Sequence, residues 1–245
     1  MAGEKVAFIT GGNRGLGLET ARQLGKLGIT VVIGSRDLAN GKQAVEKLKA
    51  DGVAAEAVKF DITNAADYQD IYKYFDRKYG KLDILVNNAG IARENFLGGN
   101  QTSTTTAAVL HEVFDTNFFG AVQLTQTLLP LIKKAPAGRI VNLSSILGSL
   151  ALHADPNSPI YNAKAFAYDA SKAALNSFTV HLAHELKDTR IKVNSAHPGW
   201  VKTDMGGEQA PMEIPDGAKT SVALATLADD GPTGAYIHMG QPLPW

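Results

Sequence analysis

The sequence predicts an α/β fold with one doubly wound parallel sheet and helices on both faces. Two observations carry this prediction. Short apolar runs rich in Val and Ile recur along the 245 residues, as expected for parallel strands that are buried on both faces. Amphipathic stretches separate these runs and end near Gly28, Gly52 and Gly80, a typical helix stop. In such a fold a ligand binds where the strands end.

We expect a single domain over residues 1–245, with residues 1–145 as the half that binds a cofactor. Seven strands are expected, at 6–10, 30–34, 54–60, 82–87, 139–144, 191–196 and 235–239. The clearest helices are expected at 15–27, 40–51 and 64–79. Three irregular stretches rich in Gly, Pro, Asn and Ser follow the fourth, fifth and sixth strands, at 91–105, 147–165 and 199–216. They are candidate substrate loops.

The composition excludes several classes of protein. Lys and Arg together number 24 and balance 24 Asp and Glu, so no overall charge attracts nucleic acid or an anionic membrane. There is no cysteine, which excludes disulfides and a thiolate metal site and fits a reducing compartment. The first apolar segment is too short for a signal peptide or a membrane span. We therefore expect a cytoplasmic protein without nucleic-acid or membrane partners.

A glycine-rich turn, TGGNRGLG at 10–17, directly follows the first strand. Gly11, Gly15 and Gly17 allow a tight turn and a close approach to a pyrophosphate at the start of the next helix. Its spacing differs from GxGxxG, and a plain strand-to-helix turn is the alternative. The turn predicts a dinucleotide site in a Rossmann-type fold, with Asn13, Arg14 and Leu16 also beside the cofactor.

The end of the second strand bears on the choice of dinucleotide. A cofactor with a free ribose 2′-hydroxyl favours an acidic residue there, but the strand ends in Gly34, Ser35 and Arg36. Arg36 and Arg14 together suit a 2′-phosphate, which predicts NADP(H). The alternatives are that either arginine is merely solvated, or that Asp37 takes the place of Arg36 and weakens the preference.

A tyrosine and a lysine lie four residues apart in the segment Tyr168-Asp169-Ala170-Ser171-Lys172. On a helix this spacing puts both on one face, roughly 6 Å apart along the axis. A phenol with a pKa of about 10 can serve as a proton donor near neutrality if a cation stabilises its phenolate. Lowering that pKa to about 7 requires about 4 kcal/mol, which Lys172 and an oxidised nicotinamide could supply. A chance pairing on an amphipathic helix is the alternative.

Other polar residues follow buried strands. The strand at 139–144 delivers Ser144 and Ser145 to the ligand edge, and strand alternation gives them opposite directions. The fourth strand ends in NNAG at 87–90, which permits close backbone approach or forms a plain turn. Asn117 interrupts an apolar helical pattern, where a structural kink is the alternative to a functional role.

These motifs, in this order and together with Pro198-Gly199-Trp200-Val201-Lys202-Thr203, resemble those of the short-chain dehydrogenase/reductase family. The resemblance extends from about Lys5 to Ala228. It implies that Tyr168 donates a proton, Ser145 holds the carbonyl oxygen, Lys172 binds the nicotinamide ribose and Asn117 positions a relay water. It also implies further cofactor contacts from a set of loop residues, namely Asp61, Ile62, Asn88, Ala89, Gly90, Tyr168, Lys172, Pro198, Gly199, Val201 and Thr203.

Within this family, the segments SSILGS and HPGWVKTDM are similar to those of carbonyl reductases that act on many aldehydes and ketones. The segment between Ser145 and Tyr168 is about ten residues longer than usual in the family. A still longer insertion blocks dimerisation in related monomers, so we expect a monomer, with a homodimer or homotetramer as alternatives. The segment could equally wall the substrate pocket.

The expected function is therefore reversible hydride transfer from NADPH to a small-molecule aldehyde or ketone. Alternatives are a dedicated reductase of a 3-oxoacyl thioester, steroid or sugar, and an NADP(H)-binding regulator that lacks activity. No metal site is expected, because His181, His184 and Glu185 lack a further ligand nearby. Tyr161 has no lysine four residues on and is expected in loop packing. An apolar substrate site could be lined by Ile91, Phe96, Trp200, Met205 and Trp245.

Overall fold

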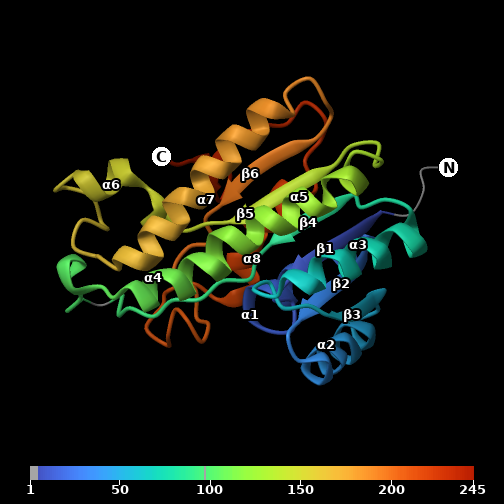
Figure 1. The fold of residues 1–245 in the computed structure, drawn as a ribbon, viewed down its shortest axis with the longest axis horizontal. Helices are drawn as coiled ribbons and strands as arrows, with labels where there is room; N and C mark the ends of the chain where they lie inside the picture. The colour runs from blue at the N-terminus through green and yellow to red at the C-terminus, as the bar shows by residue number, and fades with distance from the viewer. Residues whose placement is uncertain (1–4, 97) are drawn as a thin grey trace.

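The computed structural model describes residues 5–96 and 98–245; the first four residues and residue 97 of the expected loop 91–105 lie outside this description. The described chain forms one sheet in the order β3-β2-β1-β4-β5-β6-β7-β8 (Figure 1). Strands β1 to β7 pair in parallel and β8 pairs antiparallel with β7. The strands are β1 Val6–Thr10, β2 Thr30–Ser35, β3 Ala55–Lys59, β4 Ile84–Asn87, β5 Arg139–Leu143, β6 Lys192–Ala196, β7 Tyr236–His238 and β8 Gln241–Pro242.

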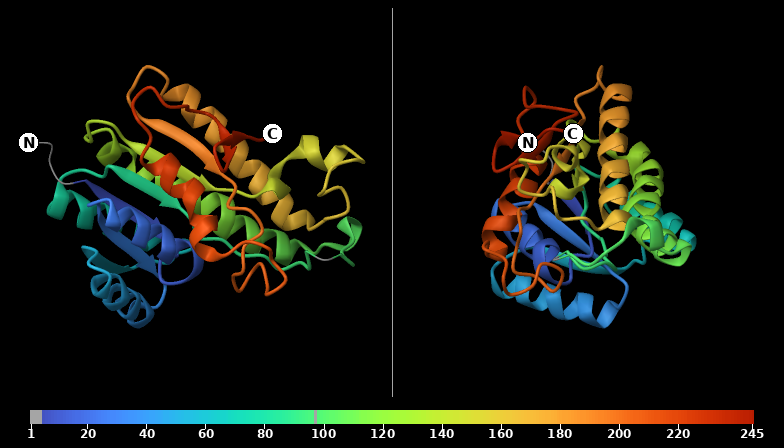
Figure 2. Two further views of the ribbon diagram at one scale, coloured as in Figure 1. Left: turned by 180° about the vertical axis from the view of Figure 1, so that it is seen from behind. Right: turned by 90° about the vertical axis from the view of Figure 1, so that its left-hand side faces the viewer.

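Helices cover both faces of this sheet. The helices are α1 Gly15–Lys26, α2 Leu38–Ala50, α3 Ala65–Tyr79, α4 Ala107–Phe114, α5 Gly120–Ile132, α6 Leu150–Ala154, α7 Phe166–Glu185 and α8 Ile214–Ala225. Helices α3, α5 and α7 lie in front of the sheet in Figure 1, and α1 and α8 lie on the opposite face, seen in the left view of Figure 2. The predicted doubly wound, Rossmann-type α/β fold is therefore confirmed.

Alternating side chains of the strands build two cores. In β1, Val6 and Phe8 point into the core under α3 and α5, where Phe8 contacts Phe75 with ring centroids 5.3 Å apart. Ala7 and Ile9 point to the other face and pack with residues of α1, α2 and α8. All four are at most 1% exposed, because a strand between two helical layers is apolar on both sides. This explains the continuous apolar runs in the sequence.

The strand order indicates at which edge of the sheet a ligand is expected to bind. The chain winds outward in one direction from β1 to β3 and then returns to β4 on the other side of β1. The neighbouring strands β1 and β4 therefore form a topological switch point, where a crevice opens at their carboxyl ends. Among the described residues, no helix is both long and apolar enough to cross a lipid bilayer.

Candidate active site

A cleft of about 1280 Å³ runs along the carboxyl ends of the strands. All but one of the predicted site residues line it, namely Gly11, Asn13, Arg14, Gly15, Leu16, Gly17, Arg36, Asp61, Ile62, Asn88, Ala89, Gly90, Ser145, Tyr168, Lys172, Pro198, Gly199, Val201 and Thr203. Asn117 lies behind the cleft wall. The fold therefore brings together residues that are far apart in the sequence.

The glycine-rich turn adopts a shape that other residues resist. Gly11 and Gly15 have φ angles of 63° and 53°, in the left-handed region that glycine tolerates. A Cβ on Gly17 would lie 2.6 Å from the carbonyl oxygen of Gly11, so this position has no room for a side chain. Helix α1 begins at Gly15 with no side-chain cap and no acidic residue in its first turn. Its first N–H groups are left for an anion.

Asn88 holds the glycine-rich turn in place. Its Nδ2 donates to the carbonyl oxygens of Thr10 and Gly11 at 2.8 and 3.3 Å. The Thr10 hydroxyl accepts from the backbone N–H groups of Asn88 and Ala89 at 3.0 and 2.9 Å. Asn88 lines the cleft, but its amide donors are already used by the turn. Its side chain therefore shapes the glycine-rich turn.

The two arginines expected at a 2′-phosphate both line the cleft, in different surroundings. Arg36 is exposed and makes no ion pair with any residue in the described part of the chain. Arg14 pairs with Asp204 of the loop after β6, and both of these side chains are more than 70% exposed. Such an exposed pair adds little stability, so a bound anion can displace Asp204.

Asp37 serves as a helix cap. Its Oδ1 accepts from the backbone N–H groups of Ala39 and Asn40 at 2.7 and 3.4 Å, at the start of α2. The predicted start of this helix at residue 40 was two residues late, because the capping role of Asp37 was missed. One oxygen of the Asp37 carboxylate is therefore occupied by the helix cap.

Asp61 and Ile62 follow β3 on the cleft wall. Asp61 Oδ1 accepts from the backbone N–H of Thr63 at 3.0 Å and from its hydroxyl at 2.8 Å, which fixes the turn. Ile62 is 5% exposed and belongs to the core under α3 and α5. These two residues form a rigid, partly apolar side of the cleft.

Tyr168 and Lys172 lie on one face of α7, and both are buried. The Lys172 Nζ lies 5.6 Å from the centroid of the Tyr168 ring and donates to the backbone oxygen of Leu143 at 2.8 Å. Ser145, two residues after Leu143, hydrogen-bonds to the Tyr168 hydroxyl. The structure therefore brings Tyr168, Lys172 and Ser145 together at the end of β5.

Burial dominates the electrostatics of this cluster. It raises the pKa of Tyr168 to about 12, against a smaller lowering by the hydrogen bond from Ser145. It also lowers the pKa of Lys172 to about 8. The sequence predicts a lowered tyrosine pKa when the lysine and an oxidised nicotinamide are both present. In the chain alone the shift is in the opposite direction, because removing the phenol from water penalises its phenolate.

The two serines after β5 have different neighbours. Ser145 Oγ accepts from the backbone N–H of Leu147 at 3.2 Å and faces Tyr168. Ser144 is 2% exposed and lies near Tyr236. These different neighbours fit the alternation expected along a strand, and the serine beside the tyrosine is Ser145, the one that the family resemblance implies.

Asn117 lies in a π-helical turn, Asp115–Phe119, between α4 and α5. Its Nδ2 donates to the backbone oxygen of Ile91 at 2.9 Å and to Ser171 Oγ at 3.0 Å, while its Oδ1 accepts from the Ile91 N–H at 2.8 Å. The side chain is 1% exposed and is fully used in fixing the chain after β4. The irregular turn is the kink that the sequence analysis considered.

The three expected loops wall the far side of the cleft. Apolar residues on it include Ile91, Phe96, Trp200 and Met205, as expected from the sequence. The ring of Phe96 meets that of Tyr168 edge-on, with centroids 5.0 Å apart. Two aromatic residues lie elsewhere: Trp245 stacks on Tyr236, and Tyr161 lies under the ammonium of Lys164. The cleft wall next to Tyr168 is apolar, and the remaining wall contains both apolar and polar side chains.

Two buried residues that the sequence analysis missed support the segment around Ser145. His197 Nδ1 accepts from the backbone N–H of Ile146 at 3.1 Å, and burial lowers the pKa of this histidine to about 3. The hydroxyl of Tyr236 donates to the backbone oxygen of Ser145. Both come from the neighbouring β6 and β7 segments, so no local sequence pattern could identify them.

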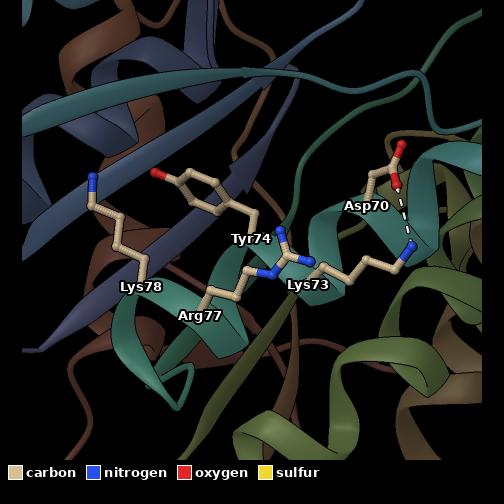
Figure 3. A pocket seen from close by; sticks show the side chains of 5 residues that line it. All are labelled: Asp70, Lys73, Tyr74, Arg77 and Lys78. Carbon is tan, nitrogen blue, oxygen red and sulfur yellow. Dashed lines mark ion pairs between the residues drawn. The ribbon is translucent and has the colours of Figure 1, made fainter.

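A second, shallower hollow of about 440 Å³ lies on the outer surface of α3, away from the cleft (Figure 3). Five side chains of one helix line it, namely Asp70, Lys73, Tyr74, Arg77 and Lys78. Lys73 pairs with Asp70 at 3.8 Å, and Lys78 pairs with Glu56. Its lining is mostly cationic and comes from a single helix, so it lacks the grouping of residues from distant segments that the cleft has. Among the described residues no group of three or more potential ligands could hold a metal ion.

Comparisons with known proteins agree with this geometry. The short chain dehydrogenase family matches residues 5–214. A carbonyl reductase (NADPH) 1 from Pongo abelii is 33% identical, over 100% of this chain and 99% of that protein. A (+)-neomenthol dehydrogenase from Capsicum annuum is 30% identical, over 96% and 95%. The NADPH-bound carbonyl reductase structure from chicken fatty liver superposes with a TM-score of 0.85 at 28% identity, covering 99% of both chains. The chain belongs to the short-chain dehydrogenase family of oxidoreductases.

Proposed function

We propose that this protein reduces an aldehyde or ketone to the alcohol with NADPH. The observation that carries the proposal is the convergence of Tyr168, Ser145 and Lys172 on one cleft with the glycine-rich turn. One end of this cleft has the free helix N-terminus and the arginines, and the other end has an apolar wall. The names of the carbonyl reductase relatives support the same substrate class.

The chain's groups fit NADPH at the anionic end of the cleft. The first turn of α1 offers unused N–H groups for a pyrophosphate, and Arg36 has no competing ion pair in the described structure. Arg14 lies in the glycine-rich turn, directly before α1. It exchanges its weak ion pair with Asp204 for a 2′-phosphate. We infer a preference for NADPH over NADH, in line with the NADPH of the chicken enzyme's structure.

Tyr168 acts as the general acid in this proposal. When bound, NADPH would supply the hydride for the carbonyl carbon and would thereby be oxidised to NADP⁺. Tyr168 transfers its hydroxyl proton to the carbonyl oxygen, and Ser145 holds that oxygen by a hydrogen bond. The carbonyl double bond thus becomes a single bond with a new C–H and a new O–H. In the reverse direction the phenolate of Tyr168 accepts the proton of the alcohol.

Lys172 and Asn117 complete the proposed relay. Lys172 lies beside Tyr168 with a pKa near 8, so its ammonium is charged at neutral pH and stabilises the phenolate after proton transfer. Its remaining donors bind the nicotinamide ribose. Asn117 has committed its side chain to Ile91 and Ser171, so its backbone carbonyl is the group left to position a relay water.

Of the two alternatives, a dedicated reductase has specific support and a regulator does not. A dedicated reductase of one metabolite fits the same catalytic groups, and the 30% identity to a (+)-neomenthol dehydrogenase favours this alternative over a regulator. A regulator that binds NADP(H) without chemistry has no use for the buried Tyr168 and Lys172 together.

We also propose that the protein is a monomer, because residues 147–165 fold against the start of α7 through a His153–Asp169 contact of 3.3 Å. Light scattering tests this oligomeric state.

The test is a screen of NADPH oxidation over structurally diverse aldehydes and ketones, with identified alcohol products. We expect turnover of apolar carbonyls and little turnover of charged ones. Activity with a single compound would select the dedicated reductase. Binding of NADPH without turnover of any carbonyl in the screen would contradict the proposal and favour the regulator.

A further inference from the structure

Helix α7 carries Tyr168 in its first turn, but the residue at its N-cap position does not cap that turn. The residue before it is Ala165, which makes no side-chain cap, and alanine is among the poorest residues at this position. Every helix leaves its first N–H groups without partners inside the helix, and buried ones need another acceptor. Ala167 and Tyr168 are both buried, so their N–H groups need such an acceptor.

Glu94 supplies the cap from a distant part of the chain. Its Oε1 accepts from the backbone N–H of Ala167 at 3.1 Å, and its Oε2 accepts from that of Tyr168 at 3.0 Å. The carboxylate also lies at the positive end of the helix dipole, where a negative charge is favourable. Both oxygens are therefore used by the second and third residues of α7. Glu94 does not line the cleft, and its hydrogen bond to the tyrosine is to the backbone N–H and not to the phenol.

The segment that carries Glu94 is itself held at several points. Arg93 makes two hydrogen bonds to Glu112 of α4. Asn100 donates to the backbone oxygen of Lys164 at 2.7 Å, just before α7. Phe96 packs edge-on against the ring of Tyr168. In Figure 1 this green segment and α7 meet at the same end of the molecule, together with α6.

We propose that Glu94 is a positioning residue for Tyr168, which sets the direction of the phenol by capping the first turn of α7 from the substrate-side loop. This inference rests on the proposed function, in which Tyr168 is the proton donor. The same short segment holds the tyrosine backbone through Glu94 and its ring through Phe96. A substrate that contacts this segment can therefore change the position of Tyr168 through Glu94 and Phe96.

The test compares Glu94→Ala and Glu94→Gln with Glu112→Gln as a matched control. Glutamine has the shape of glutamate but only one acceptor oxygen, so it can cap only one of the two N–H groups. Glu112→Gln weakens the Arg93 anchor of the same loop and leaves the cap intact. We expect kcat to fall about tenfold in Glu94→Ala and about threefold in Glu94→Gln, with the KM for the carbonyl and the Kd for NADPH within about twofold.

A purely structural role for Glu94 predicts a different pattern. It would lower the melting temperature in both Glu94 variants and leave their kcat per folded enzyme within about twofold of the wild type. That result, or an equal loss of kcat in Glu112→Gln, would overturn the proposal. If Glu94→Ala does not fold, the isosteric Glu94→Gln decides by the same comparison.

Amide hydrogen exchange separates this inference from the proposed function. We expect faster exchange of the Ala167 and Tyr168 N–H groups in Glu94→Gln and unchanged exchange in Glu112→Gln. If the wild type reduces no carbonyl, the proposed function fails, while a selective loss of protection still shows that Glu94 is the cap. Unchanged exchange at both positions in Glu94→Gln would refute the capping role whatever the activity.

Discussion

The ammonium of Lys172 lies 5.6 Å from the centre of the Tyr168 ring and is anchored to the Leu143 backbone oxygen at 2.8 Å. The anchor fixes a buried cation at the end of β5, one helical turn from a buried phenol. Burial opposes ionisation of both groups, raising the pKa of Tyr168 and lowering that of Lys172. Each therefore costs stability when it is charged, and this arrangement leads to predictions for activity and for stability.

Replacing Tyr168 by Phe removes the proposed proton donor and keeps the ring that Phe96 contacts. We expect kcat for carbonyl reduction to fall about a thousandfold, because a positioned general acid contributes on this scale. The Kd for NADPH, measured by fluorescence titration, should stay within about twofold. Tyr161→Phe is the control, since this tyrosine lies outside the cleft. Near-normal turnover by Tyr168→Phe would show that another group donates the proton.

Arg36→Ala tests the choice of cofactor. Loss of a charged contact to the 2′-phosphate is expected to raise the KM for NADPH about tenfold and to change the KM for NADH by less than about twofold. Steady-state kinetics with both cofactors gives the comparison, with Arg77→Ala on the outer surface of α3 as the control. Equal use of NADPH and NADH by the wild type would contradict the phosphate-binding role of the arginines.

Lys172→Met is expected to stabilise the protein at neutral pH while it lowers activity. Burial lowers the pKa of Lys172 from 10.5 to about 8. The unfolded chain keeps this proton up to about pH 10.5, so folding costs free energy below pH 8 and the cost disappears as the pH rises. The variant should gain on the order of 3 kcal/mol in unfolding free energy at pH 7.

Urea titrations of both proteins at pH 7 and pH 10.5 measure this gain. The difference between the two proteins should shrink at the higher pH. Tyr168 is present in both, so its own titration cancels in the comparison. A difference that does not depend on pH would mean that the change in packing, and not the buried charge, determines the stability of the variant.

His197 contributes to acid sensitivity. Burial lowers its pKa from 6.5 to about 3. Between these two pH values His197 is protonated in the unfolded chain and neutral in the folded chain. Stability is therefore lost as the pH falls from 6.5 towards 3. His197→Asn removes this titration and keeps an acceptor for the Ile146 N–H. We expect it to lose less unfolding free energy than the wild type between pH 7 and pH 4.

The comparison variant for His197 is Ala, which removes the acceptor as well. Its kcat is expected to fall about fivefold, because the unpaired Ile146 N–H adjoins Ser145. Urea titrations and steady-state kinetics on both variants give the two readouts. If His197→Asn lost as much unfolding free energy between pH 7 and pH 4 as the wild type, His197 would not be the group that controls stability in acid.

The sequence by itself determined the sheet, the glycine-rich end of the cleft and the Tyr168–Lys172 pair. These features depend on local rules: apolar runs for buried strands, glycine where φ is positive, and four-residue spacing on a helix. The expected seven strands all form. The two-residue β8 and the early start of α2 were missed, because pairing and capping at the ends of elements depend on individual hydrogen bonds.

Only the tertiary structure decided which residues support the tyrosine and serine. Glu94 and Tyr168 are 74 positions apart, and Tyr236 and Ser145 are 91 apart, so no window of sequence contains either pair. The tertiary structure also decided the pKa directions at the site, which depend on burial by segments from several strands. Tyr168 is recognisable from its neighbours along the chain, but its position depends on residues that only the folded sheet brings to it.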